Sequence, residues 1–406
     1  MAGWAVCLAA IFAIAGCAED VGDIDRTQPN KIKKSDLTGE WYSQRTVVDM
    51  PAADGFTFVG SMDNSGLTRI KWDIQEEYLY ARRQTELIDG ADRKEEEGDD
   101  YKGEVIASFR IVKHFDIQRQ YNAQTGEQSN VIVENSSDRP WYERDYMRVD
   151  WSQNLVTNYD LNFEAKSVEP VPYYVQDEQP DGTRHPDAPL FDYGQRGGPE
   201  DEEGELNYFD VTNKLFARAG SIYFPGYGDI PLCWLRGYEF KECGAGEYTI
   251  RNSFKKIDPD HEYVPMDYSG ERSSIFGYFD TVRYQYDDQE GIREQGKKRY
   301  INRFNLWKKW YDSDGNLLPV EDRVLDPIVY HVNRDFPDDL KPMAIAVGEQ
   351  WNTAFEKSVT AAGYNLSDGE DAFILCPNNP VEEGDPAQCG APGTSPRLGD
   401  IRYSFM

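Results

Sequence analysis

Histidines have the greatest scope for metal binding or acid–base chemistry in this sequence, which contains four: His114, His185, His261 and His331. A helical zinc site of the H-E-x-x-H type needs two histidines one turn apart, but no two of these lie within five positions of each other. Residues 261–265 (HEYVP) begin like that motif, yet Pro265 occupies the second histidine position and would break the helix. We therefore interpret His261 as a loop residue and His331, in a predicted strand, as a packed or edge histidine. The sequence predicts no metal ligands in this chain.

Four of the six cysteines form two closely spaced pairs, Cys233 with Cys243 and Cys376 with Cys389. Four cysteines allow three connectivities, and we expect the local one, in which each pair closes a short loop. Each disulfide would stabilise the fold by about 3 kcal/mol through the entropy of the unfolded chain. Neither spacing matches the short C-x₂₋₄-C of a zinc knuckle, and the lack of C-x-x-C argues against a redox role.

The N-terminus has the features of a bacterial secretory signal. Residues 5–15 form an apolar run of eleven residues, which suits a signal core and is too short to span a bilayer. It leads into residues 14–17 (IAGC), which resemble the bacterial lipoprotein box. That resemblance implies that residues 1–17 are a lipoprotein signal peptide and that Cys17 carries a lipid anchor on a bacterial membrane of the cell envelope. The alternative is an ordinary cleaved signal with an incidental cysteine, since the first four residues contain no Lys or Arg.

The sequence carries a net charge of −30, which argues against nucleic acid as a partner because phosphates would repel it. Acidic residues are concentrated in loop-like stretches at 92–100, 200–205 and 287–294. We interpret them as solvated surface; calcium is the alternative, since hard cations prefer oxygen ligands. Residues 311–318 (YDSDGNLL) superficially resemble a calcium loop, but they lack its final glutamate, and we predict a hairpin turn there.

Residues 36–322 are predicted to form a β-rich region, preceded by a polar tether at 18–35. Residues 210–219 are predicted to form a helix that ends at Gly220, and the loop-like stretch 176–205 is a possible boundary within the region. Short runs of alternating apolar and polar residues, rich in aromatic and β-branched side chains, are typical of strands. These runs are 68–75, 78–83, 104–112, 146–151, 221–224, 246–257 and 274–286.

Residues 323–406 follow a different pattern, with a strand, a long helix and two further strands. The first strand lies within 326–337, and Asp338 and Asp339 then suit a helix N-terminus. Apolar residues recur at steps of three and four as far as Gly363, which predicts an amphipathic helix. Strands at 372–377 and 398–406 follow, and the second of these reaches the last residue without a following partner.

Two motifs in this segment resemble the catalytic domain of metzincin-type zinc metallopeptidases, in which a W-N-x-A-F helix precedes a D-I-R-x-x-F strand. The residues that carry the resemblance are Trp351, Asn352 and Phe355 in WNTAF, and Asp400 and Arg402 in DIRYSF. The whole chain also resembles large bacterial zinc-dependent metalloprotease lipoproteins, in which a long β-rich region precedes the peptidase domain. The resemblance implies that residues 323–406 form the N-terminal half of a metzincin-like α/β domain.

The resemblance also implies zinc as the cofactor of a longer parent protein and a peptide or protein as its substrate. Because the H-E-x-x-H helix of that family is missing here, we expect this chain to be the N-terminal portion of a membrane-anchored zinc metallopeptidase, not catalytic by itself. The β-rich region would be a prodomain or a module that binds and positions substrate. The alternative is a non-catalytic cell-envelope lipoprotein that binds partners or builds surface structure and keeps a degenerate peptidase-like domain.

Overall fold

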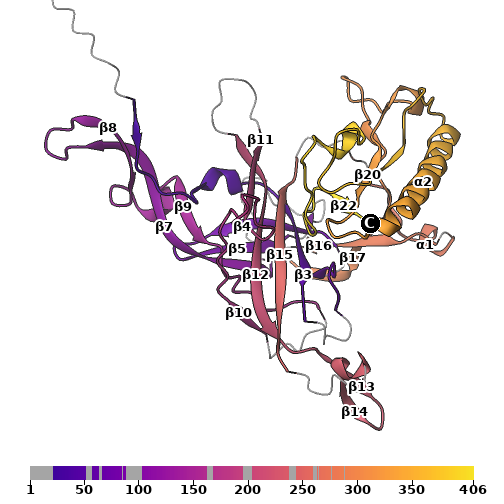
Figure 1. Ribbon diagram of the computed structural model, residues 1–406, viewed down its shortest axis with the longest axis horizontal. Helices are drawn as coiled ribbons and strands as arrows, with labels where there is room; N and C mark the ends of the chain where they lie inside the picture. Colours follow the sequence, from indigo (N-terminus) through magenta and orange to yellow (C-terminus); the bar gives the residue numbers. More distant parts are fainter. Residues whose placement is uncertain are drawn as a thin grey trace, which may run out of the picture.

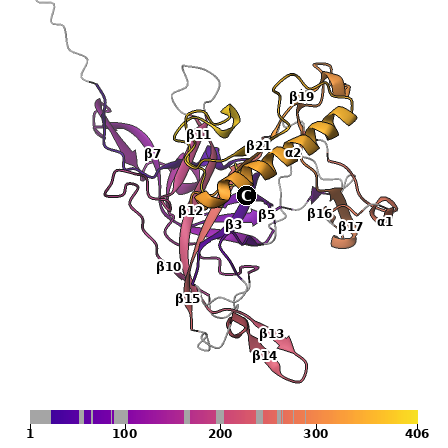
Figure 2. The same cartoon turned by 45° about the vertical axis from the view of Figure 1, so that its right-hand side comes forward.

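Strands dominate the structure, a computed structural model, and most of them belong to one large curled sheet (Figure 1). A wing made by strands β7 (Val105–Tyr121) and β8 (Gln128–Asn135) extends from one side, and a unit containing the long helix α2 (Lys341–Ala361) lies on the other. In the turned view, α2 lies on the outside of that unit (Figure 2). The described residues are 22–51, 57–63, 66–84, 86–87, 103–161, 168–194, 204–236, 244–258, 263, 265–275, 277–287 and 289–406.

Twelve strands form the curled sheet. Its main hydrogen-bonded order is β1-β8-β7-β5-β4-β3-β15-β12-β10, while β11 pairs with β12 and β9 pairs with both β7 and β2. The structure therefore confirms a mostly β fold and places five of the predicted strands in this sheet, while a sixth, 221–224, forms a separate hairpin. Besides β7 and β8, the strands are β1 (Ile24–Asp25), β2 (Ile32–Lys33), β3 (Trp41–Asp49), β4 (Thr68–Ile74), β5 (Tyr78–Arg83), β9 (Tyr146–Asp150), β10 (Glu169–Val171), β11 (Leu190–Gly194), β12 (Glu205–Ala217) and β15 (Gly246–Lys256).

One face of the sheet, here called the aromatic face, carries the main hydrophobic core. Phe209 lies at its centre, with its ring centroid 4.8 Å from that of Phe254 and 5.3 Å from that of Trp151. Trp41 and Trp72 approach the same ring at 5.7 and 5.6 Å. Edge-to-face and offset contacts of this kind add to the stabilisation that burial provides. Because this core lies on one side of the sheet, the opposite face of β12 and β15, here called the polar face, can contact other parts of the chain.

Residues 210–219, predicted to be a helix, instead lie mostly in strand β12, so that prediction is wrong. The strand pairs with β15 over ten residues, from Tyr208 opposite Lys255 to Ala217 opposite Gly246. It is buried on both sides, because Val211 faces the aromatic core while Asp210 and Thr212 are buried on the polar face. A strand that is buried on both faces loses the simple alternation of apolar and polar residues that would identify it.

Part of the predicted tether is also in the sheet, which corrects that prediction for residues 24–33. Strand β1 pairs with β8 and strand β2 with β9, and Ile32 is buried in the main core. The carboxylate of Glu134 holds this segment, since it accepts hydrogen bonds from the backbone N–H of Gln28 (2.9 Å) and from Arg148 Nη2 (2.6 Å). The segment was predicted to be a tether because its composition is polar, and composition does not indicate these specific contacts.

Glu134 gives the wing a predictable sensitivity to acid. Hydrogen bonds from Arg148 lower the pKa of this carboxyl group to about 2, from an ordinary value of 4.5. A depressed folded-state pKa stabilises the fold above pH 4.5, and this contribution is lost as the pH falls from 4.5 towards 2. We expect the Glu134→Gln variant to be less stable than the parent at neutral pH and to show a weaker loss of stability over that range, measured by urea unfolding. Equal acid sensitivity in the variant and the parent would contradict this, and Glu127→Gln, at an exposed position on the same wing, is the control.

The remaining elements form small sheets and short helices around the curled sheet. In the predicted strand 274–286, helix α1 ends at Ile275 and the strand begins only at Asp280, so its first part is wrong. The hairpin turn predicted at 311–318 is confirmed by the bridge between Tyr311 and Leu317. The strands are β6 (Glu86–Leu87), β13 (Ser221–Phe224), β14 (Gly228–Pro231), β16 (Asp280–Asp287), β17 (Gly291–Ile301), β18 (Trp307–Lys309) and β19 (Val324–Leu325). The helices are α1 (Arg272–Ile275) and the 3₁₀ turns Lys34–Leu37, Trp141–Glu143, Leu232–Arg236, Val320–Asp322, Asp338–Leu340 and Ala387–Cys389.

Residues 328–405 form the unit here called the α/β unit. Its strand β20 (Ile328–His331) lies between β21 (Phe373–Cys376) and β22 (Ser404–Phe405), and both pairings are parallel. Helix α2 packs closely on β21, because a Cβ at Gly348 would lie 2.8 Å from the Cβ of Leu375. The order of strand, long helix and two strands is thus as predicted.

The terminal strand is much shorter than the one predicted at 398–406. Only Ser404 and Phe405 pair, and residues 399–402 form a turn instead. The side chain of Asp400 accepts a hydrogen bond from the backbone N–H of Arg402 (3.1 Å), and the N–H of Tyr403 donates to the carbonyl of Asp400 (3.1 Å). A local side-chain bond of this kind competes with strand pairing, which explains the difference.

Candidate functional site

A cluster of charged side chains joins the curled sheet to the α/β unit, and we call it the arginine cluster. Alternate residues of a strand face the same side, so the strands place these residues on the polar face. The register pairs Asp210 with Ser253 and Thr212 with Arg251, which makes Asp210 and Arg251 diagonal neighbours. The cluster consists of Asp192, Tyr208, Asp210 and Arg251 from the sheet and Arg397, Asp400 and Arg402 from the α/β unit.

Asp210 is the anionic centre of the arginine cluster, and its side chain is 0% exposed. Its Oδ2 accepts hydrogen bonds from Tyr208 Oη (2.7 Å) and from Arg397 Nη2 (2.5 Å). Its Oδ1 lies 3.7 Å from Arg251 Nε. A buried carboxylate without partners would be strongly unfavourable. One aspartate on the sheet therefore requires both guanidinium groups, one of which comes from the α/β unit.

Backbone carbonyl groups accept further hydrogen bonds from the terminal nitrogens of both arginines. Arg251 donates to the carbonyl oxygens of Leu398 (2.5 Å) and Pro186 (2.6 Å). Arg397 donates to the carbonyl oxygens of Ala188 (2.8 Å) and Pro186 (3.1 Å). Because a guanidinium group carries five donors in a fixed plane, each arginine can hold several chain segments at once. The loop before β11 and the segment before β22 are thereby fastened to the same face of the sheet.

The predicted motif residues Asp400 and Arg402 form the second half of the cluster. Arg402 donates from Nε and Nη2 to the two carboxylate oxygens of Asp400, at 3.0 and 2.6 Å. It also donates to Asp192 Oδ2 (2.5 Å), and its guanidinium carbon lies 4.0 Å from the ring centroid of Tyr208. This is a bidentate ion pair stacked on an aromatic ring, and it bridges the α/β unit and strands β11 and β12.

Burial and neighbouring charges set the protonation states in the cluster. Burial, followed by the charges of Asp210 and Asp400, raises the pKa of the Tyr208 phenol, so Tyr208 stays protonated and can donate to Asp210. Burial lowers the pKa of Arg251, and the charge of Asp210 opposes that shift. Burial also disfavours the charge of Arg402, but its hydrogen bonds to Asp400 and the charges of Asp400, Tyr208 and Tyr403 together outweigh burial and raise the pKa of Arg402.

A cavity of about 560 Å³ opens beside the arginine cluster, between the sheet and the α/β unit. Its charged lining is nearly balanced, with four arginines and three aspartates. Two of those arginines, Arg251 and Arg397, already make contacts within the cluster. The charged residues that line it are Asp49, Arg184, Asp187, Arg251, Arg334, Asp335 and Arg397.

The arrangement is suited to holding two parts of the chain together. Its members are arginines, aspartates and one protonated tyrosine, and the closest contacts between them are ion pairs and hydrogen bonds. Buried charges that satisfy one another restrict relative movement, because breaking one contact leaves the other group unpaired. The candidate site is therefore a positioning joint.

The three histidines that the structure describes make separate contacts, and one of them, His185, lines the cavity beside the arginine cluster. His331 is buried with Nε2 3.2 Å from the carbonyl oxygen of Cys389, and burial lowers its pKa. His185 Nδ1 accepts the N–H of Asp187, and burial lowers the pKa of His114. In the described part of the chain, no group of three or more His, Cys, Asp or Glu side chains is placed to hold a metal ion. The described residues thus do not fit a zinc site, and His261 lies outside them.

The predicted cysteine and signal residues are only partly described. Cys376 and Cys389 form a disulfide across thirteen positions, the local pairing that we expected for them. Cys233 is buried, but Cys243 lies outside the described residues, as do Cys17 and the whole signal segment. The acidic stretch 92–100 and most of 200–205 lie outside as well, so the calcium alternative stays a prediction. Among the described helices, none is both long and apolar enough to cross a bilayer.

The helical motif residues make contacts of a different kind from those of Asp400 and Arg402. Asn352 Oδ1 accepts the backbone N–H groups of Ala372 (2.9 Å) and Phe373 (3.0 Å), which fixes the start of β21 against the helix. Phe355 stacks on Phe373 with ring centroids 6.1 Å apart, whereas Trp351 is 52% exposed. The two motifs therefore support the α/β unit at separate places.

Sequence reasoning missed Asp210, Arg251 and Arg397. Asp210 was assigned to a helix, and Arg251 was treated as an ordinary residue of a predicted strand. A signal for Arg251 was present, since Thr249, Arg251 and Ser253 alternate with apolar and amide residues in the strand. Nothing in the local sequence around Arg397 indicates its contact with Asp210.

Comparison with known proteins gives no relative for this chain: no protein-family model, curated protein or solved structure matches it.

Proposed function

We propose that the chain is the non-catalytic part of a membrane-anchored zinc metallopeptidase of the bacterial cell envelope, and that its curled sheet positions the peptidase-like α/β unit. The arginine cluster is the observation that supports the positioning role of the sheet. It links Asp210 and Arg251 of the sheet to Arg397 of the α/β unit through buried contacts. If the curled sheet did not position the α/β unit, it would not need buried ion pairs and hydrogen bonds to that unit.

Two features of the α/β unit support the metallopeptidase assignment. Helix α2 covers a parallel sheet in which β20, the first strand, lies between the two later strands. The residues that resemble the family also have distinct tasks, since Asn352 fixes the start of β21 and Arg402 pairs with Asp400. The zinc ligands would belong to a part of the polypeptide that this sequence does not contain.

The native gene product, extracted from membranes, tests the proposal. We expect mass spectrometry to find peptides beyond Met406 that include two histidines four positions apart, and a lipid-modified N-terminal peptide at Cys17. We also expect the purified protein to contain zinc and to lose peptidase activity on treatment with a chelator.

A mature protein that ends at Met406 and holds no zinc would contradict the peptidase proposal. The alternative, a non-catalytic envelope lipoprotein that binds partners or builds surface structure, would then take its place. An unmodified Cys17 would contradict the anchor alone.

A further inference from the structure

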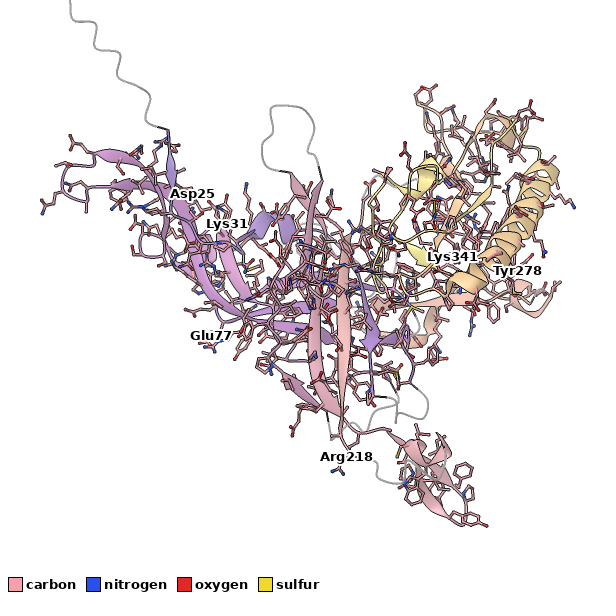
Figure 3. All side chains as sticks on the ribbon, viewed as in Figure 1. Asp25, Lys31, Glu77, Arg218, Tyr278 and Lys341 are labelled. Atoms are coloured by element: carbon pink, nitrogen blue, oxygen red, sulfur yellow. A yellow bond between two sulfur atoms is a disulfide. The ribbon has the colours of Figure 1, made fainter. Side chains whose placement is uncertain are left out.

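Strands β13 and β14 form a hairpin that projects from the end of β12, away from the α/β unit (Figure 1). Arg218, labelled in Figure 3, marks the point where the chain leaves the sheet for the hairpin. The backbone closes the base, where the N–H of Leu232 donates to the carbonyl of Gly220 (2.9 Å). At the tip, the N–H of Tyr227 donates to the carbonyl of Phe224 (3.0 Å). The hairpin is therefore an ordered projection.

The hairpin exposes large apolar side chains to an unusual degree. Tyr223 is 67% exposed and Tyr227 is 86% exposed, while Ile222 and Phe224 are each 40% exposed. Trp234, just beyond the hairpin, is 53% exposed. Several large apolar side chains exposed together on a soluble surface mark an interaction site more often than single ones do.

The same segment is almost free of charge. Residues 219–234 contain one charged side chain, Asp229, in a chain whose residues are 29% charged. The usual acidic surface of this protein is thus interrupted at the hairpin. This composition favours a binding partner with an apolar interior and a polar edge that forms hydrogen bonds with tyrosine hydroxyl and tryptophan indole groups.

We propose that the β13–β14 hairpin docks on a lipid bilayer, with its aromatic side chains in the interfacial region between headgroups and acyl chains. Tyrosine and tryptophan favour that region, because one end of each ring system is apolar and the other is polar. A projecting tip can enter a bilayer without a shaped pocket, whereas a protein partner would need a matching groove. With a net charge of −30, the chain is not drawn to anionic lipids, so binding should depend on the aromatic residues.

This proposal is independent of the peptidase assignment. The hairpin and the first described residues leave the body at different ends of the molecule (Figure 1). A lipid contact at the hairpin would thus be a point of attachment separate from the predicted anchor at Cys17. Two points of attachment would restrict rotation of the protein relative to the membrane surface.

Vesicle sedimentation tests the proposal, with the mature chain from residue 17 onward carrying Cys17→Ser, so that neither the apolar signal segment nor a lipid anchor contributes. We expect this parent to bind phosphatidylcholine vesicles, and not to bind more tightly when phosphatidylglycerol is added. The triple variant Tyr223→Ser, Phe224→Ser and Tyr227→Ser should lose at least about tenfold in partitioning, because binding scales with the apolar area that enters the interface. Its thermal unfolding should match the parent's, since the three side chains are exposed.

The matched control removes three exposed aromatic residues elsewhere, through Tyr142→Ser, Tyr174→Ser and Phe279→Ser, and should bind like the parent. As a second measurement, tryptophan emission should shift to shorter wavelength on addition of vesicles, and Trp234→Phe should reduce that shift. The proposal is overturned if the parent does not bind, if it binds only anionic vesicles, or if the hairpin and control variants bind equally. A parent that ignores vesicles but forms oligomers that the hairpin variant cannot form would identify a protein contact instead.

Discussion

Replacing Phe209 with alanine is expected to destabilise the curled sheet by about 3–5 kcal/mol. The side chain is 0% exposed and contacts aromatic rings from several strands. Its removal would leave a cavity that the neighbouring rings fill poorly, because strands β3, β4 and β15 hold them in place. Urea unfolding, followed by tryptophan fluorescence, measures the loss.

Phe216 provides the matched control, because it lies on the same strand and is 40% exposed. The Phe216→Ala variant should change stability by no more than about 0.5–1 kcal/mol. Equal losses in the two variants would show that the aromatic cluster does not hold the sheet together, and would contradict the central place given to Phe209.

The sequence predicted those parts of the fold in which the spacing of apolar residues matches the secondary structure that the segment adopts. Residues 68–75, 78–83 and 246–257 alternate clearly, and each becomes a strand. The helix at 341–361 was predictable because its apolar residues follow helical spacing and Gly363 ends it with a positive φ of 105°. In 68–75 and 78–83 the pattern reflects one buried face. Strand 246–257 is buried on both faces, and in the helix Ala344 and Val359 are buried whereas Met343 and Trp351 are 68% and 52% exposed.

The prediction failed where burial comes from distant parts of the chain. In residues 210–219, Val211, Leu215 and Ala219 recur every four positions, which imitates a helix. The strand forms because β15 pairs with it from Tyr208 to Ala217 and the α/β unit covers its polar face. For the same reason the polar segment 24–33 was taken for a tether, although residues more than one hundred positions away hold it.

The candidate site was predictable only in part. A resemblance pointed to Asp400 and Arg402, and both belong to the arginine cluster, although in a turn and not in a strand. Asp210 and Arg397 are 187 positions apart. No spacing rule relates such residues, because the sheet has to form before its polar face can receive the α/β unit.

The Asp210→Asn variant should weaken the joint between the sheet and the α/β unit by about 3–5 kcal/mol, because it leaves buried guanidinium groups without their carboxylate. The change keeps the shape of the side chain, so the loss reports charge and not volume. Asp192→Asn is the control: its side chain is 48% exposed in its pair with Arg402, and the expected loss is no more than about 1 kcal/mol.

The region of the molecule that responds distinguishes a positioning joint from a general stabilising network. Hydrogen exchange of the β20–β22 amides should accelerate in Asp210→Asn, while the amides of β3, β4 and β15 keep their protection, because the aromatic face does not depend on Asp210. Uniform acceleration across both parts would contradict a separable joint, since the sheet and the α/β unit would then unfold as one. Unchanged exchange in both would contradict the arginine cluster as the link between them. A positioning role requires that only the α/β unit loses its protection. The arginine cluster would then determine where the α/β unit lies without being needed for the sheet to stay folded.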